Sequence, residues 1–189
     1  MLALQGAFAE HAAVLEALGA HAVEVRTPSD LAGVDGLVLP GGESTTMSLL
    51  LGKNGLRDAV AERLAEGMPA FGTCAGLILL AAEVTDGRPD QQTFGVLDVT
   101  VRRNGYGRQK DSFETEVEVR DLGSRGTKGT FPAVFIRAPR IVRVGAAVDV
   151  LASVDGDPVL VRQGPVVAAA FHPELSGDLR LHHLFLGGM

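Results

Sequence analysis

Apolar positions in the first half of the chain alternate between short runs and longer stretches of helical periodicity. Residues 10–18 predict a helix, because apolar residues recur on one face and Gly19 follows the last of them. Further helices are expected at residues 45–51, 56–65 and 75–82, and strands at residues 2–4, 22–25, 36–39 and 70–72. Such alternation is typical of a parallel sheet that is covered by helices on both faces.

The second half of the chain is richer in short apolar and β-branched runs. These runs predict strands at residues 94–101, 113–119, 134–136, 148–154, 159–161 and 166–171, and a closing helix at residues 178–186. No internal repeat, low-complexity segment or linker interrupts the pattern. We therefore expect residues 1–189 to form one α/β domain.

Composition and charge narrow the class of protein. The chain has 189 residues, of which 46% are hydrophobic and 21% charged, as in ordinary globular domains. Its net charge of -6 disfavours nucleic-acid binding, which needs a positive field. No apolar stretch approaches the roughly 20 residues of a membrane span, and the first residues lack the pattern of a secretory signal. We expect a cytoplasmic protein without a membrane or nucleic-acid partner.

The single cysteine, Cys74, lies in a G-x-C-x-G segment between a predicted strand and a predicted helix. One cysteine excludes an intramolecular disulfide and a cysteine-rich zinc site. A sharp strand-to-helix turn would expose the Cys74 side chain, and the helix N-terminus would stabilise its thiolate, the attacking form of a nucleophile. A buried cysteine in a glycine-rich turn fits the same spacing, so the motif alone leaves both interpretations open.

A possible base follows the last predicted strand in the segment Phe171-His172-Pro173-Glu174. Pro173 favours an extended backbone at His172, so that His172 and Glu174, two residues apart, would point the same way. Glu174 could then fix the tautomer of the ring and leave the other nitrogen free to accept the thiol proton. Alternatively, His172 caps the sheet and Glu174 is a solvated turn residue. The remaining histidines are expected to be structural or solvated: His11, His21, His182 and His183.

Six separated segments resemble a known family, and together they cover nearly the whole chain. PGGEST (residues 40–45), FGTCAG (71–76) and FHPE (171–174) resemble the class I, or triad, glutamine amidotransferases. LALQGA (residues 2–7), GRQKDSFE (107–114) and VFIRAP (134–139) resemble one branch, the glutaminase subunit of pyridoxal 5′-phosphate synthase.

The resemblance implies a flavodoxin-like, three-layer α/β/α fold with a mostly parallel central sheet. It implies hydrolysis of L-glutamine to glutamate and ammonia by Cys74, His172 and Glu174. It also implies a partner, a (β/α)8-barrel synthase that uses the ammonia, in a complex of twelve synthase and up to twelve glutaminase subunits. The glutaminase is nearly silent without that partner, and the scheme requires no metal and no organic cofactor.

Further site residues follow from the chemistry and from the resemblance. Amide hydrolysis needs an oxyanion hole, for which the backbone N–H groups of Ala75 and Gly42 are the expected donors. The resemblance places glutamine binding on six residues: Gly42, Glu43, Ser44, Arg103, Ile136 and Arg137. The arginines suit the substrate carboxylate, although ordinary surface ion pairs fit them equally well. PGGEST also fits a tight turn in which Ser44 or Thr45 caps the next helix.

Three other functions remain open at this point. The chain could be a glutaminase subunit of another pathway, against which GRQKDSFE and VFIRAP argue. It could be a non-catalytic scaffold, against which the intact Cys74, His172 and Glu174 argue. An esterase or peptidase built on the same turn is a third candidate, and it would not respond to glutamine analogues.

Overall fold

A computed structural model describes residues 1–189 with the exception of 54, 89, 104, 106–111, 124–127 and 189. Most of the GRQKDSFE segment, residues 107–111, therefore lies outside the described residues. At the centre lies a five-stranded sheet in the order β1 (Leu37–Leu39), β2 (Ala70–Thr73), β10 (Val166–Ala169), β9 (Asp157–Gln163), β8 (Asp149–Val154). β1, β2 and β10 pair in parallel, whereas β10, β9 and β8 pair antiparallel.

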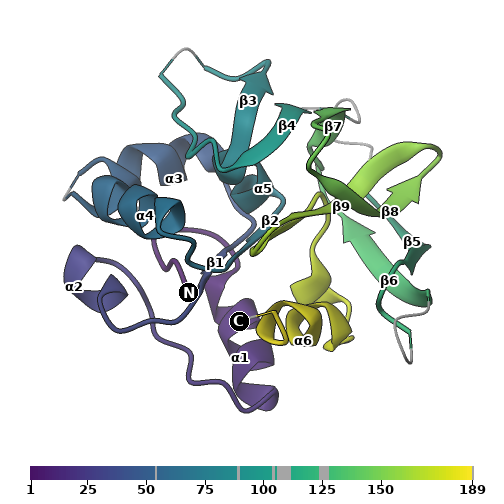
Figure 1. Ribbon diagram of the computed structural model, residues 1–189, viewed down its shortest axis with the longest axis horizontal. Coiled ribbons are helices and arrows are strands. Elements are labelled where there is room, and N and C mark those ends of the chain that lie inside the picture. The colour runs from purple at the N-terminus through teal and green to yellow at the C-terminus, as the bar shows by residue number, and fades with distance from the viewer. Residues whose placement is uncertain (54, 89, 104, 106–111, 124–127, 189) are drawn as a thin grey trace.

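Helices cover this sheet on both sides, as Figure 1 shows. α1 (Phe8–Ala17) and α6 (Arg180–Leu186) lie together on one side, and α3 (Ser44–Leu51), α4 (Leu56–Ala65) and α5 (Ala75–Leu80) lie on the other. A short helix, α2 (Pro28–Leu31), packs near α4. All residues of β1, β2 and β10 are buried, as expected for strands between two helical layers. The expected α/β fold, with a central sheet flanked by helices, is confirmed.

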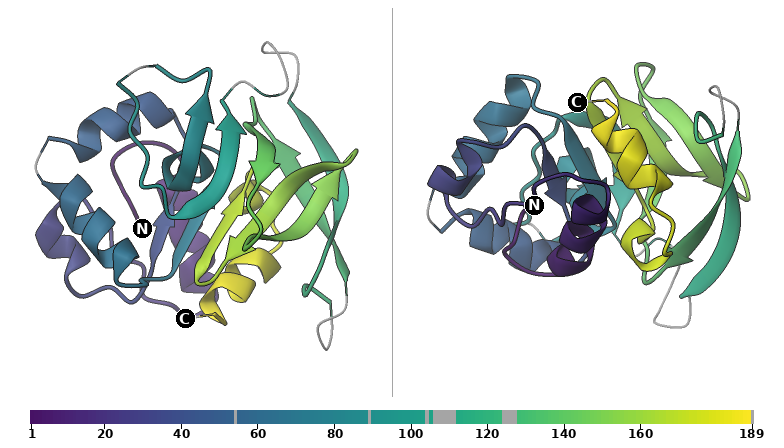
Figure 2. Two further views of the ribbon diagram at one scale, coloured as in Figure 1. Left: turned by 45° about the horizontal axis from the view of Figure 1, so that its top comes forward. Right: turned by 90° about the horizontal axis from the view of Figure 1, so that it is seen from below.

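Two smaller sheets extend the second half of the chain. One contains β3 (Ala81–Thr85), β4 (Leu97–Arg102) and β7 (Arg140–Val144), and the other pairs β5 (Phe113–Val119) with β6 (Gly129–Phe135). Figure 2 shows that these strands stand beside the central sheet, away from α1 and α4.

Several predicted elements differ from the structure. Residues 2–4 and 22–25 form only one isolated parallel bridge, Leu2 with Val25, because their backbone hydrogen bonds do not continue into a ladder. The helix predicted at residues 75–82 ends at Leu80, because Ala81 turns to an extended backbone and begins β3. β7 and α2 were not predicted. β6 is longer than residues 134–136, since a two-stranded sheet tolerates Pro132 in its middle.

The register of β2 and β10 places the ends of these two strands side by side. Thr73, the last residue of β2, pairs with Ala169, the last residue of β10. Because the two strands are parallel neighbours, the residues that follow them emerge at the same edge of the sheet. Cys74 and His172 are therefore brought together although they are far apart in the sequence.

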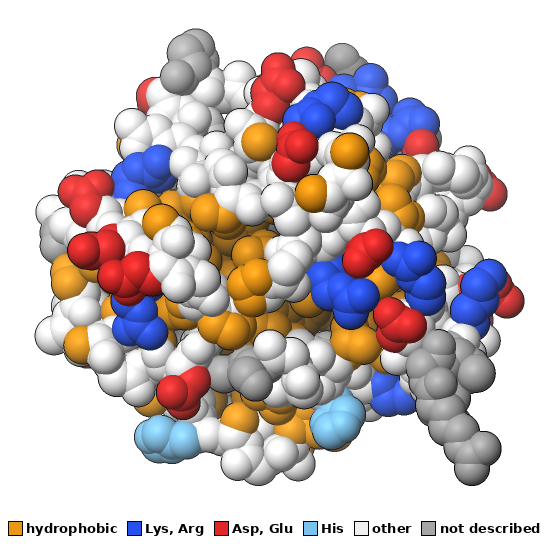
Figure 3. All heavy atoms as spheres, viewed as in Figure 1, with side chains coloured by type: hydrophobic (Ala, Val, Ile, Leu, Met, Phe, Trp, Pro, Cys, Tyr) orange, Lys and Arg blue, Asp and Glu red, His pale blue; other side chains and the backbone are white. Residues whose placement is uncertain are grey.

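The surface and the helices give two further facts. On the face drawn in Figure 3, acidic and basic side chains are intermixed, and hydrophobic side chains gather in a hollow at its centre. Within the described ranges, no helix is long and apolar enough to cross a lipid bilayer.

Candidate active site

Cys74 occupies the turn between β2 and α5, with φ 48° and ψ -98°. A non-glycine residue rarely adopts a positive φ, and such strain is typical of functional positions. The turn is held by a hydrogen bond of 2.8 Å from the Cys74 N–H to the carbonyl of Ala169 at the end of β10. Gly76 is required here, because a Cβ atom would lie 2.0 Å from the carbonyl oxygen of Leu39 in β1. The thiol is only 7% exposed, so the predicted turn exists but leaves Cys74 mostly covered.

His172 and Glu174 form a buried pair, each 8% exposed. Nδ1 of His172 lies 2.7 Å from Oε1 of Glu174. β10 ends at Ala169, and Pro173–Leu175 form a short 3-10 helix, η2, so the predicted extended geometry at residues 172–174 is wrong. The contact forms because Glu174, in the first turn of η2, folds back towards the ring that precedes it. The His172 N–H donates to Val134 O at 2.8 Å, which ties the segment to β6.

The electrostatics of this pair favour the charged form of both groups. Burial disfavours the imidazolium, but hydrogen bonds and charge interactions with Cys74 and Glu174 outweigh it and raise the pKa of His172 to about 10. Burial likewise disfavours the Glu174 carboxylate, but hydrogen bonds from His11 and His172 outweigh it and lower its pKa to about 2. His172 thus interacts with the thiol on one side and with a carboxylate on the other.

Gly41 sets the position of the His172 ring. A Cβ atom at Gly41 would lie 2.4 Å from Cε1 of His172, closer than non-bonded carbon atoms approach. The carbonyl of Gly41 also accepts a hydrogen bond of 3.0 Å from the Ala7 N–H. The first glycine of PGGEST is therefore needed for the imidazole to lie against the backbone.

A pocket of about 250 Å³ opens over Cys74. This volume lies below the range of about 300–1,000 Å³ that is typical of sites for drug-sized ligands, and it suits a molecule of amino-acid size. All of the predicted substrate and oxyanion residues line it: Gly42, Glu43, Ser44, Ala75, Arg103, Ile136 and Arg137. Cys74 and His172 line the same pocket, and Glu174 lies behind His172.

The polar residues of the pocket differ in their hydrogen-bond and ion-pair partners. Glu43 caps α3, because its Oε2 accepts from the Thr46 N–H at 2.8 Å; neither Ser44 nor Thr45 takes this role. The other carboxylate oxygen of Glu43 pairs with Arg103. Arg137 is exposed, has a positive φ of 46° and has no carboxylate partner among the described residues. Of the two arginines that line the pocket, Arg137 is thus the one without a carboxylate partner among the described residues.

Sequence reasoning missed residues that contact this site. Gln5 lines the pocket, and its Oε1 accepts a hydrogen bond of 2.7 Å from the Glu43 N–H. His182 was expected in a surface helix, but it is fully buried, because the face of α6 that carries it packs against α1. His11 contacts His182 on one side and Glu174 on the other, so that the pair lies behind Glu174 in the core. Their only sequence signal was a polar residue on an otherwise apolar helix face.

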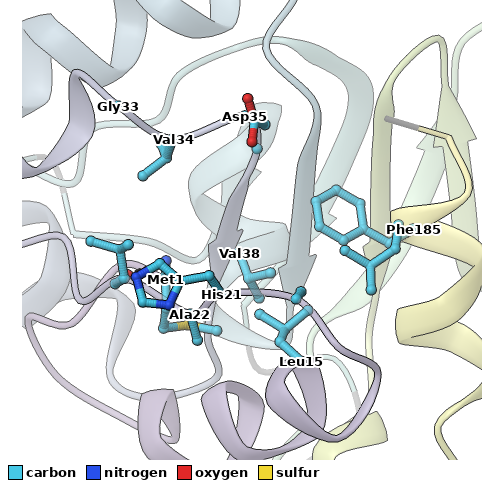
Figure 4. A pocket seen from close by; sticks show the side chains of 13 residues that line it. Met1, Leu15, His21, Ala22, Gly33, Val34, Asp35, Val38 and Phe185 are labelled. Atoms are coloured by element: carbon cyan, nitrogen blue, oxygen red, sulfur yellow. Dashed lines mark hydrogen bonds between the residues drawn. The ribbon is translucent and has the colours of Figure 1, made fainter.

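A second pocket, of about 260 Å³, lies between the start of the chain, α1 and α6. Figure 4 shows that Leu15, Val38 and Phe185 surround it, with His21 and Asp35 at its rim. None of the residues predicted to act in catalysis lines it. The chemistry that the chain offers is therefore gathered in the pocket over Cys74.

Comparisons with known proteins agree with this arrangement. The family model described as "SNO glutamine amidotransferase family" matches residues 1–189. A "Pyridoxal 5'-phosphate synthase subunit PdxT" of Mycobacteroides abscessus is 56% identical over 186 residues, which are 98% of this chain and 94% of the relative. A protein of the same description from Herpetosiphon aurantiacus is 53% identical and covers 99% of this chain and 97% of its own.

Solved structures give the same result. "Crystal structure of glutamine amidotransferase" is 50% identical, has a TM-score of 0.91 and covers 99% of this chain and 96% of its own. A putative GMP synthase subunit from Thermoplasma acidophilum, at 20% identity and a TM-score of 0.68, shares the fold. The three-layer fold, with a thiol, an imidazole and a carboxylate in series at one sheet edge, defines an α/β protein of the amidotransferase type. The chain belongs to the SNO glutamine amidotransferase family.

Proposed function

We propose that the protein hydrolyses L-glutamine to L-glutamate and ammonia, with Cys74 as nucleophile, His172 as base and acid, and Glu174 as the residue that orients His172. The observation that carries the proposal is the series of contacts from Cys74 through His172 to Glu174 at a pocket of amino-acid size. Family membership and relatives that are pyridoxal 5′-phosphate synthase subunits support the same reaction.

The geometry suggests how each step proceeds. The Cys74 thiolate attacks the side-chain carboxamide carbon, and the imidazolium of His172 protonates the leaving ammonia. Water, deprotonated by His172, then attacks the thioester and releases glutamate. Glu174 accepts from Nδ1 of His172, which leaves Nε2 as the nitrogen that exchanges protons with the thiol and the substrate.

The developing negative charge would be held by the N–H groups of Ala75 and Gly42, both of which line the pocket. Ala75 is the first residue of α5, so its N–H has no partner within the helix. The loss of one such donor typically lowers the rate by about 10²–10³-fold.

Glutamine itself would bind through Glu43, Ser44, Arg103, Ile136 and Arg137, with Gly42 close to the carboxamide. Arg137 is placed to grip the substrate carboxylate, because it has no carboxylate partner among the residues that the structure describes. Arg103 and Glu43 form an ion pair beside the pocket. Arg103 can bind the carboxylate of an amino acid, and Glu43 can bind its ammonium group.

The relatives are named as subunits of pyridoxal 5′-phosphate synthase, so we assign the ammonia to the synthase subunit of that enzyme. We further propose that this partner is a (β/α)8-barrel, that the complex holds up to twelve copies of each subunit, and that it works in the cytoplasm. A single chain with no partner would lack the acceptor for its ammonia.

Docking of the synthase would complete the oxyanion hole by turning the peptide at Gly42. In the isolated chain the Gly41 carbonyl accepts from Ala7 and the Glu43 N–H donates to Gln5, so the loop is fixed on both sides of Gly42. A rotation there has to break one of these hydrogen bonds. Structures with and without the partner that show the same Gly42 N–H direction would refute this step.

The test is ammonia release from glutamine with and without the synthase, for the native chain and for Cys74→Ala. We expect release that the synthase stimulates and that Cys74→Ala abolishes. Full activity of Cys74→Ala in the complex would exclude the mechanism. Stimulation by another ammonia acceptor, and not by this synthase, would assign the subunit to a different pathway.

A further inference from the structure

Behind the triad residues, on the side away from the pocket, two histidines from different helices meet in the core. His11 of α1 and His182 of α6 are each 0% exposed. Nδ1 of His11 lies 2.8 Å from Nε2 of His182, and Nε2 of His11 lies 3.0 Å from Oγ1 of Thr73. The same Nε2 lies 3.2 Å from Oε2 of Glu174. The mechanism above uses none of these three contacts.

The hydrogen bonds of His182 fix where the protons lie. Nδ1 of His182 is buried and has no hydrogen-bond partner among the described residues. A buried N–H without an acceptor is rarer and more costly than an unpaired lone pair, so Nδ1 carries no proton. Burial lowers the pKa of His182 to about 3, against the effect of Glu174, which agrees with a neutral ring.

The assignment at His182 determines the tautomer of His11. A neutral His182 without a proton on Nδ1 carries it on Nε2, and it donates that proton to Nδ1 of His11. His11 then carries its own proton on Nε2, the nitrogen that faces Thr73 and Glu174. The opposite tautomers would leave a buried N–H on His182 unpaired and would turn a lone pair of His11 towards the carboxylate.

Glu174 thereby has a histidine nitrogen beside each of its oxygens, a hydrogen-bond partner at Oε1 and a close contact at Oε2. Oε1 accepts from His172 at 2.7 Å, and Oε2 has His11 as its nearest nitrogen donor. Oε2 makes no hydrogen bond of good geometry within the described part of the chain, because the His11 N–H is shared with Thr73. The titratable groups around Glu174 are thus His172 on the pocket side and His11, backed by His182, on the core side.

We propose that His11, with its tautomer fixed by His182, is a positioning residue that keeps Glu174 ionised and correctly oriented for His172. The inference rests on the proposed function, since it assigns Glu174 to the orientation of the base. His11 does not line the pocket, so it acts through Glu174 and not on the substrate. In the described part of the chain these side chains are not arranged as a metal site.

Alkylation of Cys74 by iodoacetamide, followed over pH, tests the proposal without glutamine. The chain has one cysteine, so the rate reports only this thiol. His11→Leu removes the donor to Glu174, weakens the imidazolium of His172 and moves thiolate formation to higher pH. Near neutral pH we expect alkylation to be about 10-fold slower, the lower end of the effect of one hydrogen bond to a charged group, because His11 Nε2 also contacts Thr73.

Two variants serve as controls. His11→Gln keeps an N–H donor that can reach Oε2 and should restore most of the rate. His183→Leu changes the exposed neighbour of His182 and should behave as the native chain. In the glutaminase assay, His11→Leu should lower kcat and leave KM unchanged. A folded His11→Leu with the native alkylation profile over pH overturns the proposal.

A measurement on the native chain covers the case in which His11→Leu does not fold. Nitrogen-15 NMR of the imidazole rings should show the proton on Nε2 in both His11 and His182. A proton on Nδ1 of His182 would overturn the assignment. Failure of the proposed function is distinguishable, because it shows as absent ammonia release from the native chain while tautomers and alkylation stay as expected.

Discussion

His172 and His182 are both buried, and both lie within the electrostatic reach of Glu174, yet their pKa values are shifted in opposite directions. Burial lowers both. His172 contacts the carboxylate directly at 2.7 Å and also interacts with the thiol, so its imidazolium is stabilised. Among the described residues His182 hydrogen bonds to another histidine and not to a carboxylate, so burial prevails and the ring stays neutral. The comparison teaches that a direct ionised partner, and not depth, decides the charge of a core histidine.

The largest loss of activity should follow from removing the charge of Glu174, the carboxylate that contacts His172 directly. Glu174→Gln preserves shape but takes the carboxylate from His172, so the pKa of His172 should fall. By analogy with other triads, kcat should fall by about 10²–10⁴-fold. Steady-state kinetics and NMR titration of the His172 ring measure both effects. Glu118→Gln, at an exposed glutamate, is the matched control, and equal activity of the two variants would contradict the role of Glu174.

A smaller loss should follow from displacing His172 while keeping all three groups. Gly41→Ala introduces a Cβ atom 2.4 Å from the ring and must move it. A misplacement of about 1 Å can lower the rate about 100-fold. Gly33→Ala is the control, because nothing lies within 4 Å of a Cβ atom there. Steady-state kinetics should give a lower rate for Gly41→Ala than for Gly33→Ala. Similar activity of the two variants would show that the His172 ring tolerates the shift.

The pH dependence of stability should carry opposite signs for the two histidines. The pKa of His182 is lowered from 6.5, so its unfolded form binds more protons and stability rises with pH between about 3 and 6.5. The pKa of His172 is raised to about 10, so stability falls as pH rises from 6.5 to that value. The lowered pKa of Glu174 adds stability above 4.5 that is lost as pH falls towards 2.

Urea denaturation at several pH values measures these slopes. His182→Leu should flatten the stability curve between about pH 3 and 6.5 and leave the alkaline side unchanged. Glu174→Gln should flatten the alkaline side and also remove the contribution of Glu174 itself below pH 4.5. If His182→Leu changed the alkaline side, or if Glu174→Gln left it unchanged, the opposite assignment of the two rings would be wrong.

The smallest effects concern stability at a single pH. His182→Leu leaves Nδ1 of His11 without its donor and should lower the free energy of unfolding by about 1–3 kcal/mol. His183→Leu, one residue along α6 and exposed, should stay within about 0.5 kcal/mol of the native chain. Thermal and urea unfolding compare the two, and equal losses would mean that the His11–His182 contact adds no stability.

Much of the first half of the fold could be predicted, because its helices and strands have clear periods. The helix at Leu56–Ala65 and the strand at Phe113–Val119 are confirmed at both ends. β7 was missed because its five residues include two arginines. The prediction for β6 was too short because Gly129 and Pro132 are residues that disfavour strands. Local signals of this kind cannot show that pairing with a neighbouring strand overrides residue preference.

The residues of the site also fall into those that the sequence predicted and those that it could not predict. Cys74, His172 and Glu174 were found because motif residues precede or follow buried strands, and the pocket contains the residues that the resemblance indicated. Their catalytic roles stay predictions until kinetics test them. The contact between His11 and His182 could not be predicted, because it depends on how α1 packs against α6, which no local pattern encodes. Gln5 was missed for the same reason, because it contacts Glu43 across a sequence separation of 38 residues that includes α1, α2 and β1.

The pairing of β2 with β10 also sets when the site can exist. Synthesis releases the Cys74 thiol before β10 and His172, because both follow it along the chain. The Cys74 thiol of a nascent chain therefore has no base beside it. It becomes activated when β10 pairs with β2 and brings His172 next to it. Maturation of the thiol thus coincides with completion of the fold.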